Sequence, residues 1–196
     1  MALKPISEMR REEIAAAALL VLTTEGARAL TLDRVARELG ASKGIILHYY
    51  SSKDLLLSRV ISDILKILSK EIQSVVANAV GEQGRIAARL EFCVNPDIFQ
   101  NGYASAWLTV LEASNADPTL ARFRRIVRGR LNAALKSDLR PVVGQMEAAP
   151  VAESLLALID GLWLRRALEP SLLSPERAKA LLLTHLEESL AFSARS

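Results

Sequence analysis

The fold is decided by residues 31–53, which read Thr31-Leu-Asp-Arg-Val-Ala-Arg-Glu-Leu-Gly40-Ala-Ser42-Lys-Gly-Ile-Ile-Leu-His48-Tyr-Tyr-Ser-Ser-Lys53. Thr31 can cap a first helix, whose apolar positions recur at helical spacing at Leu32, Val35, Ala36 and Leu39. Gly40 suits the positive φ at a helix C-terminus, and Ser42 offers the next N-cap only two residues later. The short segment between the two predicted helices leaves room only for a tight turn. The stretch therefore predicts a helix-turn-helix, whose second helix enters the major groove of DNA.

The predicted second helix runs from residue 43 to about residue 50 and turns Ile46 inward against the first helix. Its outer face leaves the following residues to solvent or a partner: Lys43, Gly44, Leu47, His48 and Tyr49. Lys43 can donate to guanine O6 or N7, or to a phosphate. Gly44 lacks a side chain, so the start of the helix can come close to a duplex. For each residue alone, the alternative is an ordinary surface side chain.

This stretch resembles the N-terminal domain of TetR-family transcriptional regulators. The resemblance is carried by Thr31, Val35-Ala36, Gly40-Ala-Ser42-Lys-Gly44, His48-Tyr49-Tyr50 and Ser52-Lys53-Asp54-Leu55-Leu56. It implies contacts to phosphates or base edges from Thr31, Ser42, His48, Tyr49 and Lys53, and a contact between Leu47 and a thymine methyl. Two positions depart from the usual pattern: Leu47 stands where many members have Tyr, and Tyr50 where most have Phe. We expect the Tyr50 ring to be buried with its hydroxyl near a polar partner.

Composition sets the class of protein but not its ligand. The chain has 196 residues, 51% of them hydrophobic and 24% charged, as in globular proteins of one large or two small domains. The net charge of +3 is too small to prove nucleic-acid binding, so any DNA affinity must come from local clusters of basic groups. Cys93 is the single cysteine, which excludes an intrachain disulfide and suits a reducing cytosol. We expect a cytoplasmic protein that does not enter a membrane, because the N-terminus lacks the apolar core of a signal peptide.

The rest of the chain shows helical spacing and no strand-like alternation. Helices are predicted at 8–25 (capped by Ser7), 53–79 (capped by Ser52), 85–94, 103–115, from 118 onward, at 151–168 and from 175 onward, with a loop or frayed helix end at 141–150. Arg10 and Arg11 of the first helix could reach phosphates or simply be solvated. The predicted fold is all-α: residues 1–53 form a three-helix DNA-binding domain, joined by a long helix to a ligand-binding and dimerisation domain at 54–196.

Two C-terminal stretches favour a homodimer. Residues 122–140 carry a basic stripe opposed by Asp138 alone: Arg122, Arg124, Arg125, Arg128, Arg130, Lys136 and Arg140. This stripe could be a solvated face, a set of salt bridges across a subunit interface, or a surface for an acidic partner. The helix at 151–168 is apolar on nearly all sides and needs cover, which another subunit could provide.

Residues 157–168, with Asp160-Gly161-Leu and Trp163, and the segment Ala106-Trp107-Leu108 resemble the choline-responsive BetI type of the TetR family. In the wider family the helix with Asp-Gly-Leu and the basic helix before it form a dimer's four-helix interface. The resemblance implies a small-molecule effector, with a quaternary ammonium or hydrophobic cation as one class. Candidate ligand-binding residues are the rings of Tyr103, Trp107 and Trp163 and the carboxylates of Glu112 and Asp160. The alternative is that the rings are core and that Asp160 pairs with an interface arginine.

Enzyme chemistry is not expected. His48 and His185 are the two histidines, and the sequence contains no glycine-rich phosphate loop, paired-histidine metal motif or nucleophile elbow. We therefore predict no catalytic residue, no metal site and no cofactor. The predicted function is a transcriptional repressor released from a palindromic operator by a small-molecule effector. The alternatives are a dimeric architectural or interaction DNA-binding protein without an effector, and an enzyme fused to a DNA-binding domain.

Overall fold

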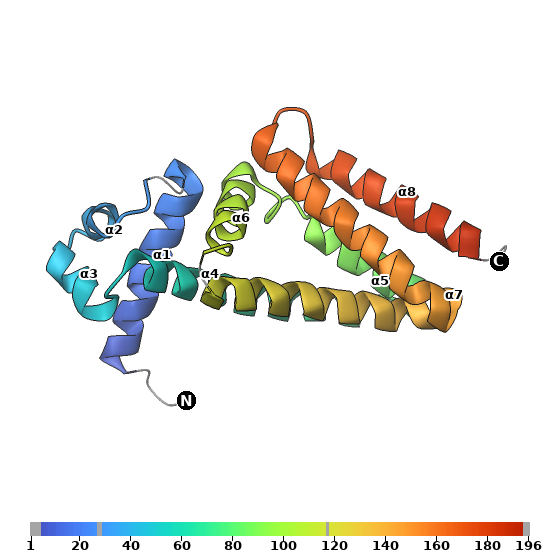
Figure 1. Cartoon of the computed structure of the whole chain (residues 1–196), viewed down its shortest axis with the longest axis horizontal. Helices are drawn as coiled ribbons and strands as arrows, with labels where there is room; N and C mark the ends of the chain where they lie inside the picture. The colour runs from blue at the N-terminus through green and yellow to red at the C-terminus, as the bar shows by residue number, and fades with distance from the viewer. Residues whose placement is uncertain (1–4, 27–28, 117, 194–196) are drawn as a thin grey trace.

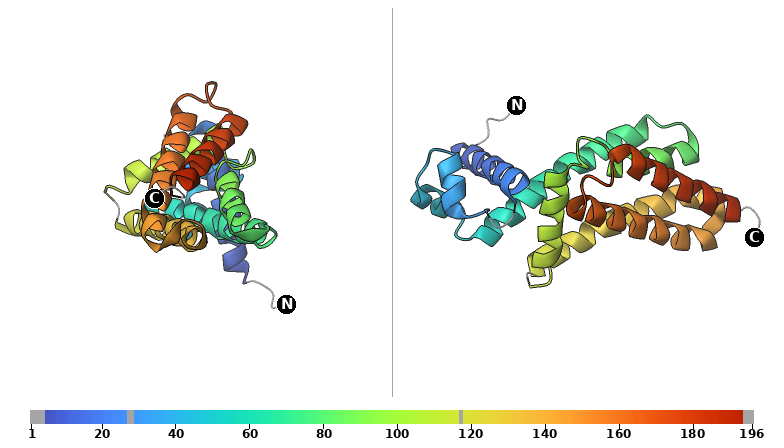
Figure 2. Two further views of the ribbon diagram at one scale, coloured as in Figure 1. Left: turned by 90° about the vertical axis from the view of Figure 1, so that its right-hand side faces the viewer. Right: turned by 90° about the horizontal axis from the view of Figure 1, so that it is seen from above.

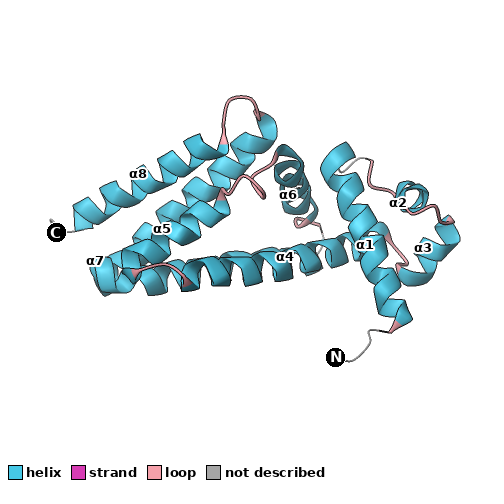
Figure 3. Cartoon of the chain, turned by 180° about the vertical axis from the view of Figure 1, so that it is seen from behind, coloured by secondary structure: helices cyan, strands magenta, loops and turns pink. Residues whose placement is uncertain are grey.

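The computed structural model describes residues 5–26, 29–116 and 118–193, and no strand occurs among them (Figures 1 and 3). The helices in these residues are α1 (Ile6–Glu25), α2 (Leu32–Glu38), α3 (Lys43–Tyr49), α4 (Lys53–Ala77), α5 (Gly81–Cys93), α6 (Asn101–Ala113), α7 (Pro118–Leu168) and α8 (Pro175–Ser193). The predicted all-α class is confirmed. The molecule is elongated, with α1–α3 at one end and α5, α7 and α8 at the other (Figures 1 and 2).

Helix α4 joins the two ends. Its 25 residues span about 38 Å at the usual helical rise. Ser52 caps it as predicted, because the Ser52 side chain accepts a hydrogen bond from the Leu55 backbone N–H. Helix α6 lies between the two ends and packs against α1 (Figure 1).

Three predicted boundaries are wrong. Helix α1 begins at Ile6, because the Pro5 carbonyl and not the Ser7 side chain caps its first turn. Helix α5 begins at Gly81, whose φ of 71° turns the chain, and Gly84 is helical. Residues 141–150, predicted as a loop or frayed helix end, are also helical. Its one break is Gly144, with φ of 84°, and α7 continues on both sides of it.

Two apolar cores hold the molecule. The first joins α1, α2, α3 and the first turns of α4, and it also contains Ala106 and Val110 of α6 and Leu120 of α7. The second joins α5, α7, α8 and the segment at 94–99. Because Leu56, Leu57, Val60 and Ile61 of α4 belong to the first core, that core extends past residue 53. The division of the chain into domains at 53 stays a prediction.

One stretch within the described residues, Leu120–Leu168, is long and apolar enough to cross a membrane by length and composition alone. Core helices of soluble proteins meet the same criterion. This stretch is broken at Gly144 and packs against α5, α6 and α8.

Candidate nucleic-acid interface

The two helices of the helix-turn-helix are fixed by their caps. The Thr31 hydroxyl accepts from the Arg34 backbone N–H at 3.1 Å, and the Ser42 hydroxyl accepts from the Ile45 N–H at 3.4 Å. Gly40 ends the first helix with a φ of 62°. Ile46 is fully buried, as predicted, and holds α3 to the first core. The local signals of the sequence therefore produce the predicted geometry.

Helix α3 lies at the outer end of the molecule, away from α5, α7 and α8 (Figure 1). Six of the predicted contact residues are exposed: Thr31, Ser42, Lys43, Gly44, Leu47 and His48. Tyr49 and Lys53 are half-buried. The Tyr49 ring meets the His48 ring edge-on, with 5.0 Å between the ring centroids, and packs against the first core. All eight predicted DNA-contacting residues thus belong to one end of the molecule, and their roles stay predictions.

Acidic side chains neutralise part of the basic charge at this end. Lys43 Nζ lies 2.7 Å from Asp33 Oδ2. Arg34 pairs with Glu25 at 2.5 Å and with Glu38 at 2.8 Å, and its guanidinium lowers the pKa of Glu25 through the hydrogen bond between them. The pairs of Lys43 with Asp33 and of Arg34 with Glu25 were not predicted, because each joins residues of two different helices.

Arg11 contacts the residues at the end of α3. Its Nη1 donates to the Tyr49 carbonyl at 2.7 Å, and its guanidinium lies 5.4 Å from the centroid of the Tyr50 ring. The Tyr50 hydroxyl donates to the Arg11 carbonyl at 3.2 Å, and burial raises the pKa of that hydroxyl. The expectation for Tyr50 is confirmed, and a phosphate role for Arg11 stays untested beside these internal contacts. Arg10 is exposed and pairs with Glu13.

The five predicted ligand-binding residues lie in different surroundings. Trp163 belongs to the second core, where its Nε1–H donates to the Cys93 carbonyl at 2.9 Å. Trp107 packs against the first core, and Tyr103 is half-buried on the same helix, α6. Glu112 is exposed, and Asp160 pairs with Arg128 of the same chain. These side chains thus lie on two helices, α6 and α7, in different surroundings, and a ligand role for them stays a prediction.

Asp138 is the buried carboxylate that the sequence missed. It is 8% exposed on α7, and it accepts from Arg89 at 2.8 Å and from Arg85 at 3.3 Å, both on α5. The sequence signal that could have indicated a buried acidic partner was the pair Arg85 and Arg89, which lie four residues apart on one helix face. The single acid of the basic stripe thus pairs with arginines of α5, whereas most of the basic residues of the stripe are exposed.

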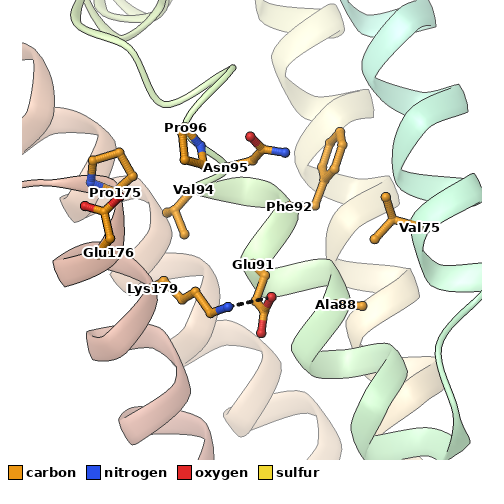
Figure 4. A pocket seen from close by; sticks show the side chains of 10 residues that line it. All are labelled: Val75, Ala88, Glu91, Phe92, Val94, Asn95, Pro96, Pro175, Glu176 and Lys179. Atoms are coloured by element: carbon orange, nitrogen blue, oxygen red, sulfur yellow. Dashed lines mark ion pairs between the residues drawn. The ribbon is translucent and has the colours of Figure 1, made fainter.

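Two surface grooves occur in the C-terminal part of the described chain. One has a volume of about 370 Å³ and lies between α5 and the start of α8, with Val75 of α4 at its edge (Figure 4). Phe92 and Glu91 line it, and Glu91 pairs across it with Lys179 at 2.8 Å. The other, of about 450 Å³, lies between α7 and α8 beside His185. None of the five predicted ligand-binding residues lines either groove. No cluster of metal-ligating side chains occurs in the part of the chain that is described.

An exposed second helix of a helix-turn-helix, carried at the end of a long helix that enters a separate helical body, defines a DNA-binding regulator. The chain matches the family described as bacterial regulatory proteins of the TetR family over residues 14–60. It matches the C-terminal family of BetI-type transcriptional repressors over residues 82–191. The protein belongs to the TetR family of transcriptional regulators, and its C-terminal part is of the BetI type.

Individual proteins agree with this assignment. The HTH-type transcriptional regulator BetI of Vibrio campbellii is 31% identical over 94% of both chains. The structure of a transcriptional regulator from Pseudomonas aeruginosa PAO1 superposes with a TM-score of 0.79 at 25% identity, covering 98% of this chain and 95% of that one. A regulator from Saccharomonospora viridis in complex with choline has the same fold, with a TM-score of 0.79 at 20% identity over 92% of this chain and 96% of that one.

These relatives are regulators and not enzymes. The chain is therefore a ligand-responsive transcriptional regulator. The alternative of an architectural protein without an effector is not favoured.

Proposed function

We propose that the protein is a homodimeric, cytoplasmic repressor that binds a palindromic operator and leaves it when a small cation binds the C-terminal domain. One observation carries the proposal. Helix α3 turns Ile46 into the core and presents Lys43, Gly44, Leu47 and His48 to solvent at the end of the molecule. An α-helix fits the major groove, where side chains reach base edges.

The residues on and around the exposed face of α3 divide into base-edge contacts and phosphate contacts. Lys43 and Leu47 are placed to reach base edges, with a donor for guanine and an apolar contact for a thymine methyl. Thr31 and Ser42 cap helix starts, so their hydroxyls and the nearby N–H groups suit phosphates. Tyr49, His48 and Lys53 complete the phosphate contacts at the other end of α3. Phosphate contacts set position and salt dependence, whereas base-edge contacts set sequence preference.

The dimer surface proposed here lies on the second half of α7. Ala157, Gly161, Leu164 and Leu168 are exposed at helical spacing along one face, although this helix buries its opposite face in the second core. Small residues let two helices approach closely, and exposed leucines gain from being covered. Two such protomers would place two α3 helices on one duplex. A palindromic site requires their separation to match one helical turn, roughly 34–36 Å, or a multiple of it.

The effector proposed is a quaternary ammonium or hydrophobic cation, supported by the choline bound to the Saccharomonospora viridis regulator. Rings and carboxylates are the groups that bind such a cation. Two candidate sites provide them. One uses the predicted set of Tyr103, Trp107, Glu112, Asp160 and Trp163, which would have to converge on binding. The other is the groove of Figure 4, which is lined by the Phe92 ring on one side, by the Glu91 carboxylate paired with Lys179 in the middle, and by Glu176 on the other side.

The DNA-binding proposal is tested by Lys43→Ala, with Lys70→Ala as the matched control. Lys70 is exposed on α4, so both variants remove one surface ammonium. An operator is first obtained by selecting bound duplexes from genomic fragments. Lys43→Ala should lower operator affinity about 10-fold, the effect of losing one base-edge contact. Equal affinities for the two variants would refute the proposed interface.

The effector proposal is tested by thermal-shift and operator-release measurements with choline, betaine aldehyde and a panel of hydrophobic cations. Glu176→Gln and Asp160→Asn distinguish the two candidate sites, because each neutralises one carboxylate of one site. The site is the one whose variant weakens the response to the cation while leaving operator affinity unchanged. A protein whose melting temperature and operator affinity respond to none of the cations would contradict the proposed effector class.

A further inference from the structure

A set of polar contacts connects α1 both to the end of α3 and to α4. It consists of Glu8 and Arg11 of α1, Tyr50 after α3, and Arg59 and Asp63 of α4. We call these five residues the brace. Tyr50 among them is buried in the first core, and the other four are part-buried at its edge.

Arg11 connects α1 to the C-terminal end of α3. Its guanidinium donates to the Tyr49 carbonyl, one of the last carbonyls of α3, which has no partner inside the helix. A positive charge at this point is also favoured by the helix dipole. Tyr50 completes the connection, because its hydroxyl donates back to the Arg11 carbonyl. Two hydrogen bonds of opposite direction therefore fix the end of α3 relative to α1.

Arg59 connects α1 to α4. Its Nη2 donates to Glu8 Oε1 at 2.6 Å, and its Nε donates to Asp63 Oδ2 at 2.5 Å. Asp63 lies one turn further along the same helix. Its contact with Nε orients the Arg59 guanidinium, and Nη2 then faces Glu8 of α1. Hydrogen bonding to Arg59 lowers the pKa of Glu8, and Arg11 contributes to the same shift by its charge. The two arginines therefore act on one carboxylate, and the two connections form one cluster.

We propose that Arg11 and Arg59 are positioning residues for operator binding: they fix the angle of α3 relative to α1 and α4, so that a movement of α4 carries α3 with it. The inference rests on the proposed function, because it takes α3 to be the helix that enters the groove. The apolar core holds the helices together but does not fix the angles between them, because the hydrophobic effect is non-directional. Charge-assisted hydrogen bonds are directional and can fix these angles. Without the brace, the angle of α3 relative to α1 and α4 should vary more, while the apolar core keeps the helix-turn-helix folded.

The first variant pair compares Arg11→Gln with Arg10→Gln. Both remove one arginine charge from α1, but Arg10 is exposed and pairs only with Glu13 among the contacts described. We expect Arg11→Gln to lower operator affinity about 10-fold, the loss expected for one charged hydrogen bond, and Arg10→Gln to leave it unchanged. The slope of log affinity against log salt should stay the same. A phosphate contact would instead lower that slope by about 1.

The second variant pair compares Arg59→Gln with Lys70→Gln, both on α4. Arg59→Lys is added because an ammonium cannot donate to both carboxylates in the fixed geometry of a guanidinium. Both Arg59 variants should weaken operator binding at temperatures where circular dichroism shows a fully helical protein. Glu8→Gln removes the same connection from the more exposed partner and serves if Arg59→Gln fails to fold. Combining Arg11→Gln with Arg59→Gln should cost less than the product of the two single effects, because both act on one angle.

The results of these experiments distinguish failure of the brace proposal from failure of the proposed DNA interface. If Lys43→Ala weakens binding but the Arg11, Arg59 and Glu8 variants bind the operator like wild type, the brace is refuted and the proposed function stands. Variants that lower only the melting temperature refute it in the same way. A reduced salt slope for Arg11→Gln would make Arg11 a phosphate contact and overturn its assignment. If Lys43→Ala has no effect either, α3 is not the groove helix, and both proposals fail.

Discussion

The ammonium of Lys43 lies 2.7 Å from the Asp33 carboxylate, and both side chains are more than half exposed. Any phosphate or guanine that binds Lys43 must displace this carboxylate, which also repels the duplex. Asp33→Asn should therefore raise affinity for DNA about 3- to 5-fold, the range expected for one exposed ion pair. Fluorescence anisotropy with operator and random duplexes over a salt series measures this change.

Asp97→Asn is the control for this prediction. Asp97 is an exposed carboxylate outside the helix-turn-helix, so its loss changes the net charge equally. If both variants raise affinity by the same factor, the effect is one of overall charge and the competition between Asp33 and DNA for Lys43 is disproved.

Trp163 offers a second test at the scale of one residue. Its Nε1–H donates to the Cys93 carbonyl, and its ring meets the Phe99 ring edge-on with 5.4 Å between centroids. Trp163→Phe keeps an aromatic ring but leaves that carbonyl without its donor, so it should destabilise the protein by about 1–3 kcal/mol. Trp163→Ala also leaves a cavity and should cost about 3–5 kcal/mol. Urea denaturation measures both changes, and a wild-type midpoint for Trp163→Ala would contradict a core role.

At the scale of helices, the closest approach between α1 and α6 depends on Gly102. A Cβ at this position would lie 2.2 Å from the Thr23 carbonyl oxygen, which is backbone and cannot rotate away. Gly102→Ala should therefore push α6 from α1, with a cost of about 1–3 kcal/mol, as in other overpacked sites. We expect the unfolding midpoint to fall, and operator affinity to change as well, because α1 carries the helix-turn-helix.

Gly129→Ala is the matched control, because nothing lies within 4 Å of a Cβ at that helical position. It should stabilise the protein by up to about 1 kcal/mol, since alanine favours the helix. Two alanine variants of equal stability would show that the contact between α1 and α6 tolerates a side chain.

The sequence predicted the helices where the signals are local. Thr31, Ser42 and Ser52 cap the helices that follow them, and Gly40 turns the chain, because each acts within a few residues of itself. It failed at 141–150, where two prolines and a glycine indicated a loop or frayed helix end. Burial of Ala148 and neighbouring residues in the second core keeps this stretch helical on both sides of Gly144.

Contacts between distant elements could not be predicted in this way. Arg11 has the spacing of a surface residue, and its role depends on where Tyr49 and Tyr50 lie, 38 and 39 residues further along the chain. Asp138 looks like the one acid of a basic surface, yet it is buried against arginines of α5. The candidate DNA-binding face was predictable because it lies on one short helix. The effector site was not, since its candidate residues come from α6 and α7, whose packing the pattern does not determine.

At the scale of the whole molecule, the candidate DNA-binding helix α3 lies at one end and the groove between α5 and α8 at the other, with α4 running between the two ends (Figures 1 and 2). A single α3 contacts one half-site, so affinity for a palindrome requires two protomers held at a fixed separation. That separation is set by the dimer surface, far from α3. In the proposed dimer, the apolar residues exposed on α7 are therefore expected to be as important for operator binding as Lys43.

This dependence gives the last prediction. Leu164 and Leu168 are 46% and 66% exposed, one turn apart on the proposed dimer face of α7. Replacing both with glutamate places two desolvated charges in that surface, so the variant should be monomeric at micromolar concentration by light scattering. Operator affinity should fall about 100-fold or more, because the second half-site is no longer bound by a linked protomer. The control is Val80→Glu, a 91% exposed position between α4 and α5, which should stay dimeric. A Leu164→Glu, Leu168→Glu variant that remains dimeric and binds the operator like wild type would move the interface elsewhere.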